Sequence, residues 1–275
     1  MPELPEVQTV VDQLDERLTG RRIAPGGAFL WPGTAGYPEA DALIARVTGR
    51  QVAGVRRRAK YILVDLGDDL LLVIHLRMTG NLHFAAPEDP AHPYLRVRLP
   101  LDNGQELRFA DMRKFGRFYA GVPNELDTVI PLARLGPEPL DEGFTPVVLG
   151  ERLAGKRGPI KSALLDQAVL AGLGNIYVDE ALFRAGINPL RPAGSLAAVE
   201  LDQLHAGIGA ALREALANRG TSFRDYLSVS GETGDNEPNL QVFRRHGQSC
   251  VRCGQPLARI VVGGRGTHYC PNCQR

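Results

Sequence analysis

The pattern of hydrophobic and polar residues has a helical period at the start of the chain. Residues 5–18 predict an amphipathic helix, because apolar side chains recur three and four residues apart and Gly20 follows as a stop signal. The apolar positions of this segment are Val7, Val10, Val11, Leu14 and Leu18.

After residue 50 the pattern becomes that of β-structure. Short runs rich in β-branched and aromatic residues alternate with turn signals, and the breaks at 67–69 (GDD) and 102–104 (DNG) predict hairpin turns. Residues 1–130 are therefore predicted to form a β-sandwich or barrel with the first helix attached. The expected strands are QVAGV (51–55), YILVDL (61–66), LLLVIHL (70–76), YLRVRLP (94–100), QELRFA (105–110) and GRFYAG (116–121).

The period changes again after a stretch rich in proline and acidic residues at 131–150, which is typical of a linker. Residues 151–240 carry helical patterns at 160–171, 175–185 and 196–218, broken at GLGN and GINPLRP. The predicted fold class is α+β and multidomain, with a helical domain at 151–240 and a small separate domain at 241–275.

The last segment contains the four cysteines of the chain. Cys250, Cys253, Cys270 and Cys273 form two C-x-x-C pairs separated by sixteen residues, a spacing typical of a structural zinc site. A ribbon of this size buries too little apolar surface to fold alone, so one zinc ion is expected to hold it together. Arg265 is the long side chain of the GGRGT turn between the two pairs.

Composition indicates a globular protein of about two domains, at roughly 150 residues each. No apolar run approaches the roughly 18 residues of a membrane span and no secretory leader is recognisable, so we expect a soluble cytoplasmic protein. The net charge is only +1, yet residues 50–60 and 240–275 contain arginines and no acid. This uneven distribution predicts a basic face that could bind a polyanion.

Seven blocks along the whole chain, taken in order, resemble bacterial formamidopyrimidine-DNA glycosylase. They are PELPEV, RRAKY, IHLRMTG, DMRKFG, LGPEPL, GLGNIYVDEALFRAGINP and the four-cysteine ribbon. The resemblance implies a monomeric base-excision repair enzyme that removes 8-oxoguanine and formamidopyrimidines from duplex DNA. It also implies strand cleavage at the abasic site by β,δ-elimination, and a β-sandwich with a terminal helix, a helix-two-turn-helix domain and a zinc finger.

The resemblance implies chemical roles for the first six residues. Removal of Met1 would leave Pro2 as the terminal amine, whose unperturbed pKa of about 8 keeps a useful fraction neutral at pH 7. The resemblance implies that Pro2 attacks C1′ and forms a Schiff base, that Glu3 acts as acid and base, and that Glu6 orients water or the amine. Without the other blocks, a capped helix start would explain these residues.

Further residues match family positions that contact DNA. The resemblance implies that Lys60 and Arg265 contact phosphates and assist catalysis, and that Asn175, the expected N-cap of a helix, binds phosphate. Met78, Arg113 and Phe115 match the side chains inserted into the duplex when the damaged base swings out. His92, Lys156 and Lys161 match positions that contact DNA or the lesion, and residues 222–239 match the lesion-covering loop.

Two alternatives remain open at this stage. An enzyme resembling endonuclease VIII would use the same amine chemistry on oxidised pyrimidines, although Leu4 and the LGPEPL block favour the purine enzyme. A damage-binding protein without catalysis would keep the basic face and the zinc ribbon, but it would have no use for Pro2, Glu3 and Lys60.

Overall fold

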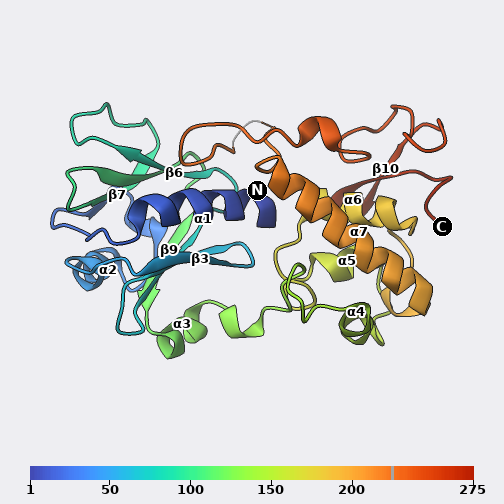
Figure 1. Ribbon diagram of the computed structural model, residues 1–275, viewed down its shortest axis with the longest axis horizontal. Helices are drawn as coiled ribbons and strands as arrows, with labels where there is room; N and C mark the ends of the chain where they lie inside the picture. Colours follow the sequence, from blue (N-terminus) through green and yellow to red (C-terminus); the bar gives the residue numbers. More distant parts are fainter. Residues whose placement is uncertain (224–225) are drawn as a thin grey trace. The chain divides into compact units, whose positions relative to one another are not determined.

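The computed structural model describes residues 1–223 and 226–275, which divide into two compact units (Figure 1). The first unit comprises residues 1–133 and 219–235, and the second comprises 134–218 and 236–275. The chain therefore leaves the first unit and returns to it. Within the described ranges, every helix is too short or too polar to cross a bilayer.

The first unit is a β-sandwich with helices at its edges. In its described residues, one sheet has four strands in the order β1-β7-β8-β6, and the other has five in the order β2-β9-β5-β4-β3. The strands are β1 (Ala28–Phe29), β2 (Ala35–Tyr37), β3 (Gly54–Arg58), β4 (Tyr61–Asp65), β5 (Leu71–His75), β6 (Gly80–Ala85), β7 (Leu95–Pro100), β8 (Glu106–Asp111) and β9 (Arg117–Gly121). The helices are α1 (Leu4–Leu18), α2 (Ala40–Val47) and α3 (Pro123–Val129), with 3-10 turns at Pro32–Thr34 and Leu132–Arg134.

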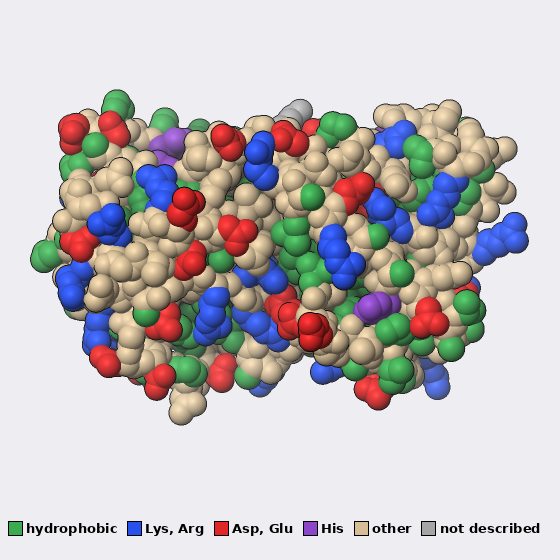
Figure 2. Space-filling model, in the orientation of Figure 1, with side chains coloured by type: hydrophobic (Ala, Val, Ile, Leu, Met, Phe, Trp, Pro, Cys, Tyr) green, Lys and Arg blue, Asp and Glu red, His purple; other side chains and the backbone are tan. Residues whose placement is uncertain are grey.

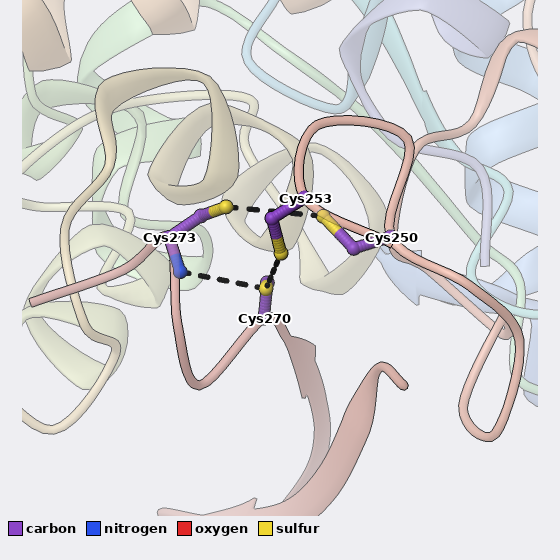
Figure 3. Close-up of side chains that lie close together, drawn as sticks. All are labelled: Cys250, Cys253, Cys270 and Cys273. Atoms are coloured by element: carbon purple, nitrogen blue, oxygen red, sulfur yellow. Dashed lines mark hydrogen bonds between the residues drawn. The ribbon is translucent and has the colours of Figure 1, made fainter. Parts of the chain in front are cut away.

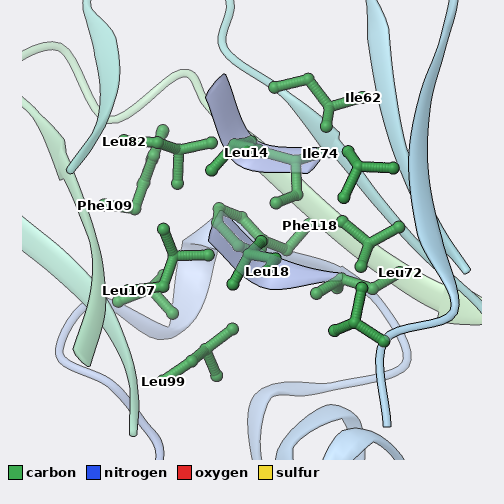
Figure 4. Close-up of a cluster of buried hydrophobic side chains, with 14 of the residues drawn as sticks. Leu14, Leu18, Ile62, Leu72, Ile74, Leu82, Leu99, Leu107, Phe109 and Phe118 are labelled. Carbon is green, nitrogen blue, oxygen red and sulfur yellow. The ribbon is translucent and has the colours of Figure 1, made fainter. Parts of the chain in front are cut away.

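The core of the sandwich lies between the two sheets and α1 (Figure 4). Phe109 of β8 and Phe118 of β9 meet edge to face there, with ring centroids 5.1 Å apart. Leu14 and Leu18 of α1 are buried in the same cluster, as the helical pattern of the sequence predicts. Each such leucine contributes about 1.5–3 kcal/mol by leaving water, which fixes the start of the chain on the sandwich.

Two connections cross between the sheets at one corner. The β5–β6 connection leaves the five-stranded sheet and enters the four-stranded one, and the β8–β9 connection runs the opposite way. Their ends are paired: His75 lies opposite Arg117, and Gly80 lies opposite Asp111. The segments 76–80 and 112–116 therefore run side by side, and we call them the wedge loops.

The second unit combines helices with a β-hairpin. Its helices are α4 (Pro146–Leu153), α5 (Ile160–Leu165), α6 (Asn175–Ala185) and α7 (Ala198–Ala217), with 3-10 turns at Ala193–Ser195 and Glu237–Asn239, and its strands are β10 (Ala258–Val262) and β11 (Arg265–Tyr269). Helices α6 and α7 pack so closely that a Cβ on Gly207 would lie 2.8 Å from the Ala181 carbonyl oxygen. Phe183 of α6 is buried with Cys250 and Cys270, which joins the ribbon to the helices.

Most predicted elements are confirmed, and several need correction. Helix α5 ends at Leu165 rather than continuing to 171, because the Gln167 side chain binds the carbonyls of Leu165 and Leu173 and accepts from Gly172 N. The pattern at 51–55 predicts a strand, whereas β3 occupies Gly54–Arg58, and α4 begins at Pro146, where the sequence pattern predicts no helix. Helices α2 and α3 and strands β1, β2 and β6 were not predicted.

Candidate active site

The amino-terminal residues are buried at the start of α1. Glu3 and Glu6 are 3% and 1% exposed, and Pro2 is also buried, whereas Met1 is 51% exposed. One oxygen of the Glu6 carboxylate, Oε2, accepts a hydrogen bond from Glu3 N at 2.7 Å. Negative charge is favoured at a helix amino terminus, so Glu6 both binds the Glu3 N–H and fixes the residue next to Pro2.

The other oxygen of Glu6 holds a distant segment of the same unit. Glu6 Oε1 accepts from Thr221 N at 2.8 Å, and the Tyr226 hydroxyl donates to the Glu6 carbonyl at 3.2 Å. Gly220 has φ +82° and a Cβ there would lie 2.9 Å from Glu6 Cγ, so glycine is required. Burial raises the pKa of Tyr226, which therefore stays a hydroxyl donor at neutral pH.

This segment overlaps the stretch 222–239 expected to cover the lesion. Gln13 of α1 accepts from Val229 N at 2.7 Å and donates to the Ser230 hydroxyl at 3.3 Å, so residues 229–230 lie against the first helix. Residues 224 and 225 of the expected loop lie outside the described residues.

Lys60 occupies the two-residue turn of the β3–β4 hairpin. Arg58 pairs with Tyr61 across this turn, and Ala59 adopts the left-handed conformation with φ 52°. Lys60 is only 6% exposed. The positive charge of Lys60 also acts on the buried His75. Burial first, and then the positive charges of Arg77 and Lys60, lower the pKa of His75 to about 3. His75 is therefore neutral at pH 7, and its Nδ1 accepts from Arg77 N at 3.0 Å.

The three side chains expected to enter the duplex lie together on the wedge loops. Met78 and Phe115 are 41% and 49% exposed, unusual values for such large apolar residues. The Arg113 guanidinium connects them: its Nη1 lies 3.0 Å from Met78 Sδ, and its Cζ lies 5.6 Å from the centre of the Phe115 ring. An exposed apolar pair around one cation suits insertion between bases.

His92 is exposed on the loop between β6 and β7. Its Nδ1 accepts from Tyr94 N at 3.1 Å. The buried Arg108 fixes the backbone of this loop, because its guanidinium donates to the carbonyls of Ala86, Pro87 and Asp89. His92 is therefore presented to solvent on a braced loop.

Lys161 does not have the environment expected of a DNA contact. It is 0% exposed, and its Nζ donates to Asp179 Oδ1 at 2.6 Å and to the Gly266 carbonyl at 3.1 Å. A fully buried ammonium needs such partners, and the contact of Lys161 with DNA or the lesion that the resemblance implies stays a prediction. Lys156, in contrast, is partly exposed and lines a shallow hollow with Arg157 and Gly194.

Asn175 and Arg265 are connected through the backbone of the hairpin. Asn175 is the first residue of α6 and Gly174 occupies the cap position, which corrects the expected N-cap. The Asn175 Nδ2 donates to the Gly266 carbonyl at 2.9 Å, next to the exposed Arg265. Asp179 Oδ2 also accepts from His268 N at 2.8 Å. Side chains of α5 and α6 thus hold the strand that begins with Arg265.

The four cysteines meet at the base of this hairpin (Figure 3). All four Sγ atoms lie within 4.8 Å of one another, with Cys253–Cys270 at 3.5 Å and Cys250–Cys273 at 3.9 Å. Tetrahedral zinc with bonds of about 2.3 Å needs thiolates about 3.8 Å apart, so the cluster fits one structural ion. The N–H groups of Arg252 and Cys273 point at cysteine sulfurs from 3.4 Å, as donors that stabilise thiolates do.

Comparison with known proteins identifies the family to which this chain belongs. Family models match residues 1–118 (formamidopyrimidine-DNA glycosylase N-terminal domain), 135–226 (formamidopyrimidine-DNA glycosylase H2TH domain) and 247–275 (zinc finger found in FPG and IleRS). The formamidopyrimidine-DNA glycosylase of Symbiobacterium thermophilum is 48% identical over 100% of this chain and 89% of its own length. The chain belongs to the formamidopyrimidine-DNA glycosylase family.

Solved structures of this family share the fold. A mutant Lactococcus lactis FPG in complex with DNA containing Fapy-dG superposes with a TM-score of 0.92, at 35% identity and with 100% of both chains covered. A complex of Lactococcus lactis Fpg with DNA containing an abasic site gives 0.91, at 35% identity and 99% coverage of both chains. The N-terminal sandwich, the H2TH domain and the cysteine ribbon are thus those of a glycosylase fold.

Sequence reasoning missed the carboxylates that hold these family residues in place. Asp111 contacts both wedge loops, and Asp179 holds the β10–β11 hairpin. The signal for each was modest: both lie inside blocks that resemble the family, DMRKFG and GLGNIYVDEALF, but neither was assigned a role. Their importance comes from contacts that are distant along the chain.

The charges on one face of the molecule are of mixed sign. In Figure 2 Lys and Arg side chains are interspersed with Asp and Glu on the visible face. Arg50, from the acid-free stretch 50–60, pairs with Asp68 at 2.8 Å, and Arg57 donates to Gln8 at 2.8 Å. Within the acid-free stretch 50–60, Arg50 is therefore compensated by an acid from another segment.

Proposed function

We propose that this protein is a cytoplasmic, monomeric base-excision repair glycosylase that removes 8-oxoguanine and formamidopyrimidines from duplex DNA and then cleaves the strand at the abasic site. The observation that carries the proposal is the buried start of α1, where Pro2 and Glu3 are fixed by Glu6. Both carboxylates suit a helix start, and a buried carboxyl group directly after the Pro2 amine also suits proton transfer in amine chemistry.

The reaction begins once Met1 has been removed, and its exposure makes it accessible to an aminopeptidase. The Pro2 nitrogen bonds to C1′, the glycosidic bond breaks, and Glu3 supplies the proton taken up by the departing base or by the sugar ring oxygen. Opening of the sugar ring at the C1′–O4′ bond leaves an iminium that acidifies C2′. Transfer of a C2′ proton to the ionised Glu3 carboxylate breaks the C3′–O bond, and loss of the C4′ proton to water then breaks the C5′–O bond. The two phosphate leaving groups stay on the flanking strands.

The other residues bind the DNA around the lesion, and Lys60 and Arg265 also assist catalysis. Lys60 and Arg265 neutralise phosphates near the lesion, Asn175 and Lys156 add contacts at the helical domain, and His92 contacts the backbone. Met78, Arg113 and Phe115 fill the space left by the extruded base, which offsets part of the unstacking cost. Glu6 positions the reactive end, since both its oxygens bind backbone N–H groups.

We also propose a division into a catalytic sandwich at 1–130, a linker at 131–150, a helix-two-turn-helix domain at 151–240 and a zinc-finger domain at 241–275. The family models at 1–118, 135–226 and 247–275 support three functional parts. The zinc ion belongs to the third part and supplies folding energy rather than chemistry, because four thiolates leave no open position.

The decisive experiment is borohydride trapping on a duplex with 8-oxoguanine opposite cytosine. We expect a covalent protein–DNA adduct that maps to Pro2 and is absent with undamaged duplex. The variant Pro2→Gly should reduce the adduct strongly, and Glu3→Gln should abolish base removal. A thymine glycol duplex is tested in parallel: preferential trapping there would favour oxidised pyrimidines, and DNA binding without any adduct would favour a non-catalytic damage-binding protein.

A further inference from the structure

Asp111 is the last residue of β8 and lies at the corner where both wedge loops leave the sandwich. It is 1% exposed. Its Oδ1 accepts from the Thr79 hydroxyl and from Arg113 N at 3.2 Å, and its Oδ2 accepts from Gly116 N at 2.7 Å. One carboxylate thus holds the loop that carries Met78 and both ends of the loop that carries Phe115.

The strand register explains why one side chain can reach both loops. Gly80 pairs with Asp111 at one end of the crossings, and His75 pairs with Arg117 at the other. In the part of the chain that the structure describes, the strand ladders pair the ends of the loops and do not extend along them. Thr79 joins them a second time, because its hydroxyl oxygen also accepts from Arg113 N at 3.1 Å.

The loops need this anchor because their backbones are held in uncommon conformations. Arg77 has φ 56° and Lys114 has φ 59°, the left-handed region that residues with a side chain rarely adopt. Each of these residues is adjacent to a wedge side chain, Met78 or Arg113. Such conformations persist only where the surroundings over-determine them, and the Asp111 carboxylate supplies the contacts.

Packing leaves little room for the loops to shift independently. A Cβ on Gly80 would lie 2.7 Å from the Phe109 ring, and one on Gly116 would lie 2.3 Å from the same ring. Both glycines are therefore pressed against one buried phenylalanine while Asp111 holds the adjacent backbone. The sheet corner and the carboxylate together fix the separation of Met78 from Arg113 and Phe115.

We propose that Asp111 is a positioning residue that holds the two wedge loops in register, so that Met78, Arg113 and Phe115 enter the duplex as one body. The inference rests on the proposed function, because it concerns how the base is extruded. Asp111 faces the loop backbones and lies in the interior, so it assists opening of the base stack and takes no part in the bonds made and broken at C1′.

The test separates base extrusion from amine chemistry. Single-turnover base removal is measured on an 8-oxoguanine duplex, with 2-aminopurine next to the lesion as a fluorescent reporter of unstacking. Borohydride trapping is measured on a single-stranded oligonucleotide with an abasic site, where no stacked pair has to open. The variants are Asp111→Asn, which turns an NH₂ group toward a backbone donor, and Thr79→Val, which removes the bridging hydroxyl at nearly constant volume. Thr79→Ser restores the hydroxyl.

We expect Asp111→Asn and Thr79→Val to lower two rates, that of base removal and that at which the 2-aminopurine fluorescence develops. Both rates should fall by about tenfold to a hundredfold, because a displacement of about 1 Å can cost that much. Trapping on the single strand should stay within about twofold, and Thr79→Ser should recover most of the duplex activity. The matched control is Asp65→Asn, since Asp65 ends β4 and accepts from Gly67 N at 2.9 Å in a hairpin remote from the wedge.

Equal losses on both substrates would overturn the proposal, since they would indicate a general folding defect. Unchanged duplex activity in Thr79→Val would overturn it as well. If the unmodified protein neither removes the base nor forms an adduct, the proposed function itself has failed, which is a different result. Thermal unfolding of each variant identifies any that does not fold, and the Thr79 pair then decides the question.

Discussion

At the scale of single residues, buried polar groups in this protein mainly hold backbone in place. Glu6 binds Glu3 N and Thr221 N, and Asp111 binds Arg113 N and Gly116 N. A buried carboxylate is costly unless donors surround it, and backbone N–H groups at helix starts and loop corners are suitable donors. The side chains expected to contact DNA can therefore be exposed while their backbones stay fixed.

His75 gives a prediction of pH dependence at this scale. Its pKa is about 3 in the folded protein and 6.5 without the fold, so the unfolded chain binds one more proton between these values. Stability should then rise with pH across this interval, by about 1.4 kcal/mol per pH unit for one such group. The contribution of neutral His75 to the free energy of unfolding is fully present above pH 6.5 and is lost as the pH falls toward 3.

The measurement is urea unfolding between pH 4.5 and 7, followed by fluorescence of Trp31, the single tryptophan of the chain, which lies in the first unit. In His75→Asn the amide oxygen can still accept from Arg77 N, but the titrating group is gone. We expect a flatter pH profile for this variant. Parallel profiles for the two proteins would contradict the assignment.

At the scale of elements, the β10–β11 hairpin has two separate supports. The cysteine cluster lies at its base, and Asp179, Lys161 and Asn175 hold β11 from the helices. The metal is expected to stabilise the fold of the ribbon, whereas the side chains from the helices fix the orientation of the hairpin within the second unit. Arg265 depends on both supports, since it begins the strand that they hold.

Zinc removal should therefore weaken DNA binding while the sandwich stays folded. In Cys250→Ser, or after chelation with verified loss of metal, we expect the affinity for lesion duplex to fall by at least about tenfold, because the hairpin that carries Arg265 loses its structure. Trp31 fluorescence should report an unchanged unfolding transition for the first unit. Unaltered DNA affinity after zinc loss would refute the role of the ribbon.

The helical support predicts a different response to mutation. Asp179→Asn removes the carboxylate that the buried Lys161 ammonium contacts at 2.6 Å, which should lower the free energy of unfolding by about 3–5 kcal/mol. The double variant Lys161→Met with Asp179→Leu removes both charges and should be clearly less destabilised than Asp179→Asn. Calorimetry of the three proteins checks this order, and equal losses would mean that the ion pair matters less than the contacts of Asp179 with His268.

At the scale of the whole molecule, the sequence predicted the elements that depend on local patterns better than the contacts between residues that are distant along the chain. Short runs rich in β-branched and aromatic residues, such as YILVDL and QELRFA, and the spacing of the cysteines are signals carried within a few residues, so β4, β8 and the ribbon were recognised. The burial of Lys161 depends on Asp179, eighteen residues away, and on Gly266, more than a hundred residues away. Periodicity carries no signal for such pairs, so the resemblance alone suggested that Lys161 contacts DNA or the lesion.

Salt dependence is a prediction for the whole molecule, because the net charge is only +1. Binding to lesion duplex should nevertheless weaken steeply with salt, with a slope of about −0.9 for each phosphate contacted. Arg265→Gln should reduce the slope by about one contact. Arg50→Gln removes the same charge from a residue paired with Asp68 and should leave the slope unchanged. Equal effects of both variants would mean that net charge, rather than local contacts, governs binding.

The return of residues 219–235 to the first unit limits how such proteins can be recombined. Tyr226 and Val229 are part of the sandwich core, and Thr221 supplies a donor to Glu6. A chimaera that takes only residues 1–133 from one parent would pair one parent's Glu6 with the other parent's loop. Exchange of parts between relatives should therefore succeed only when both stretches travel together, so the unit of inheritance for lesion choice is discontinuous along the gene.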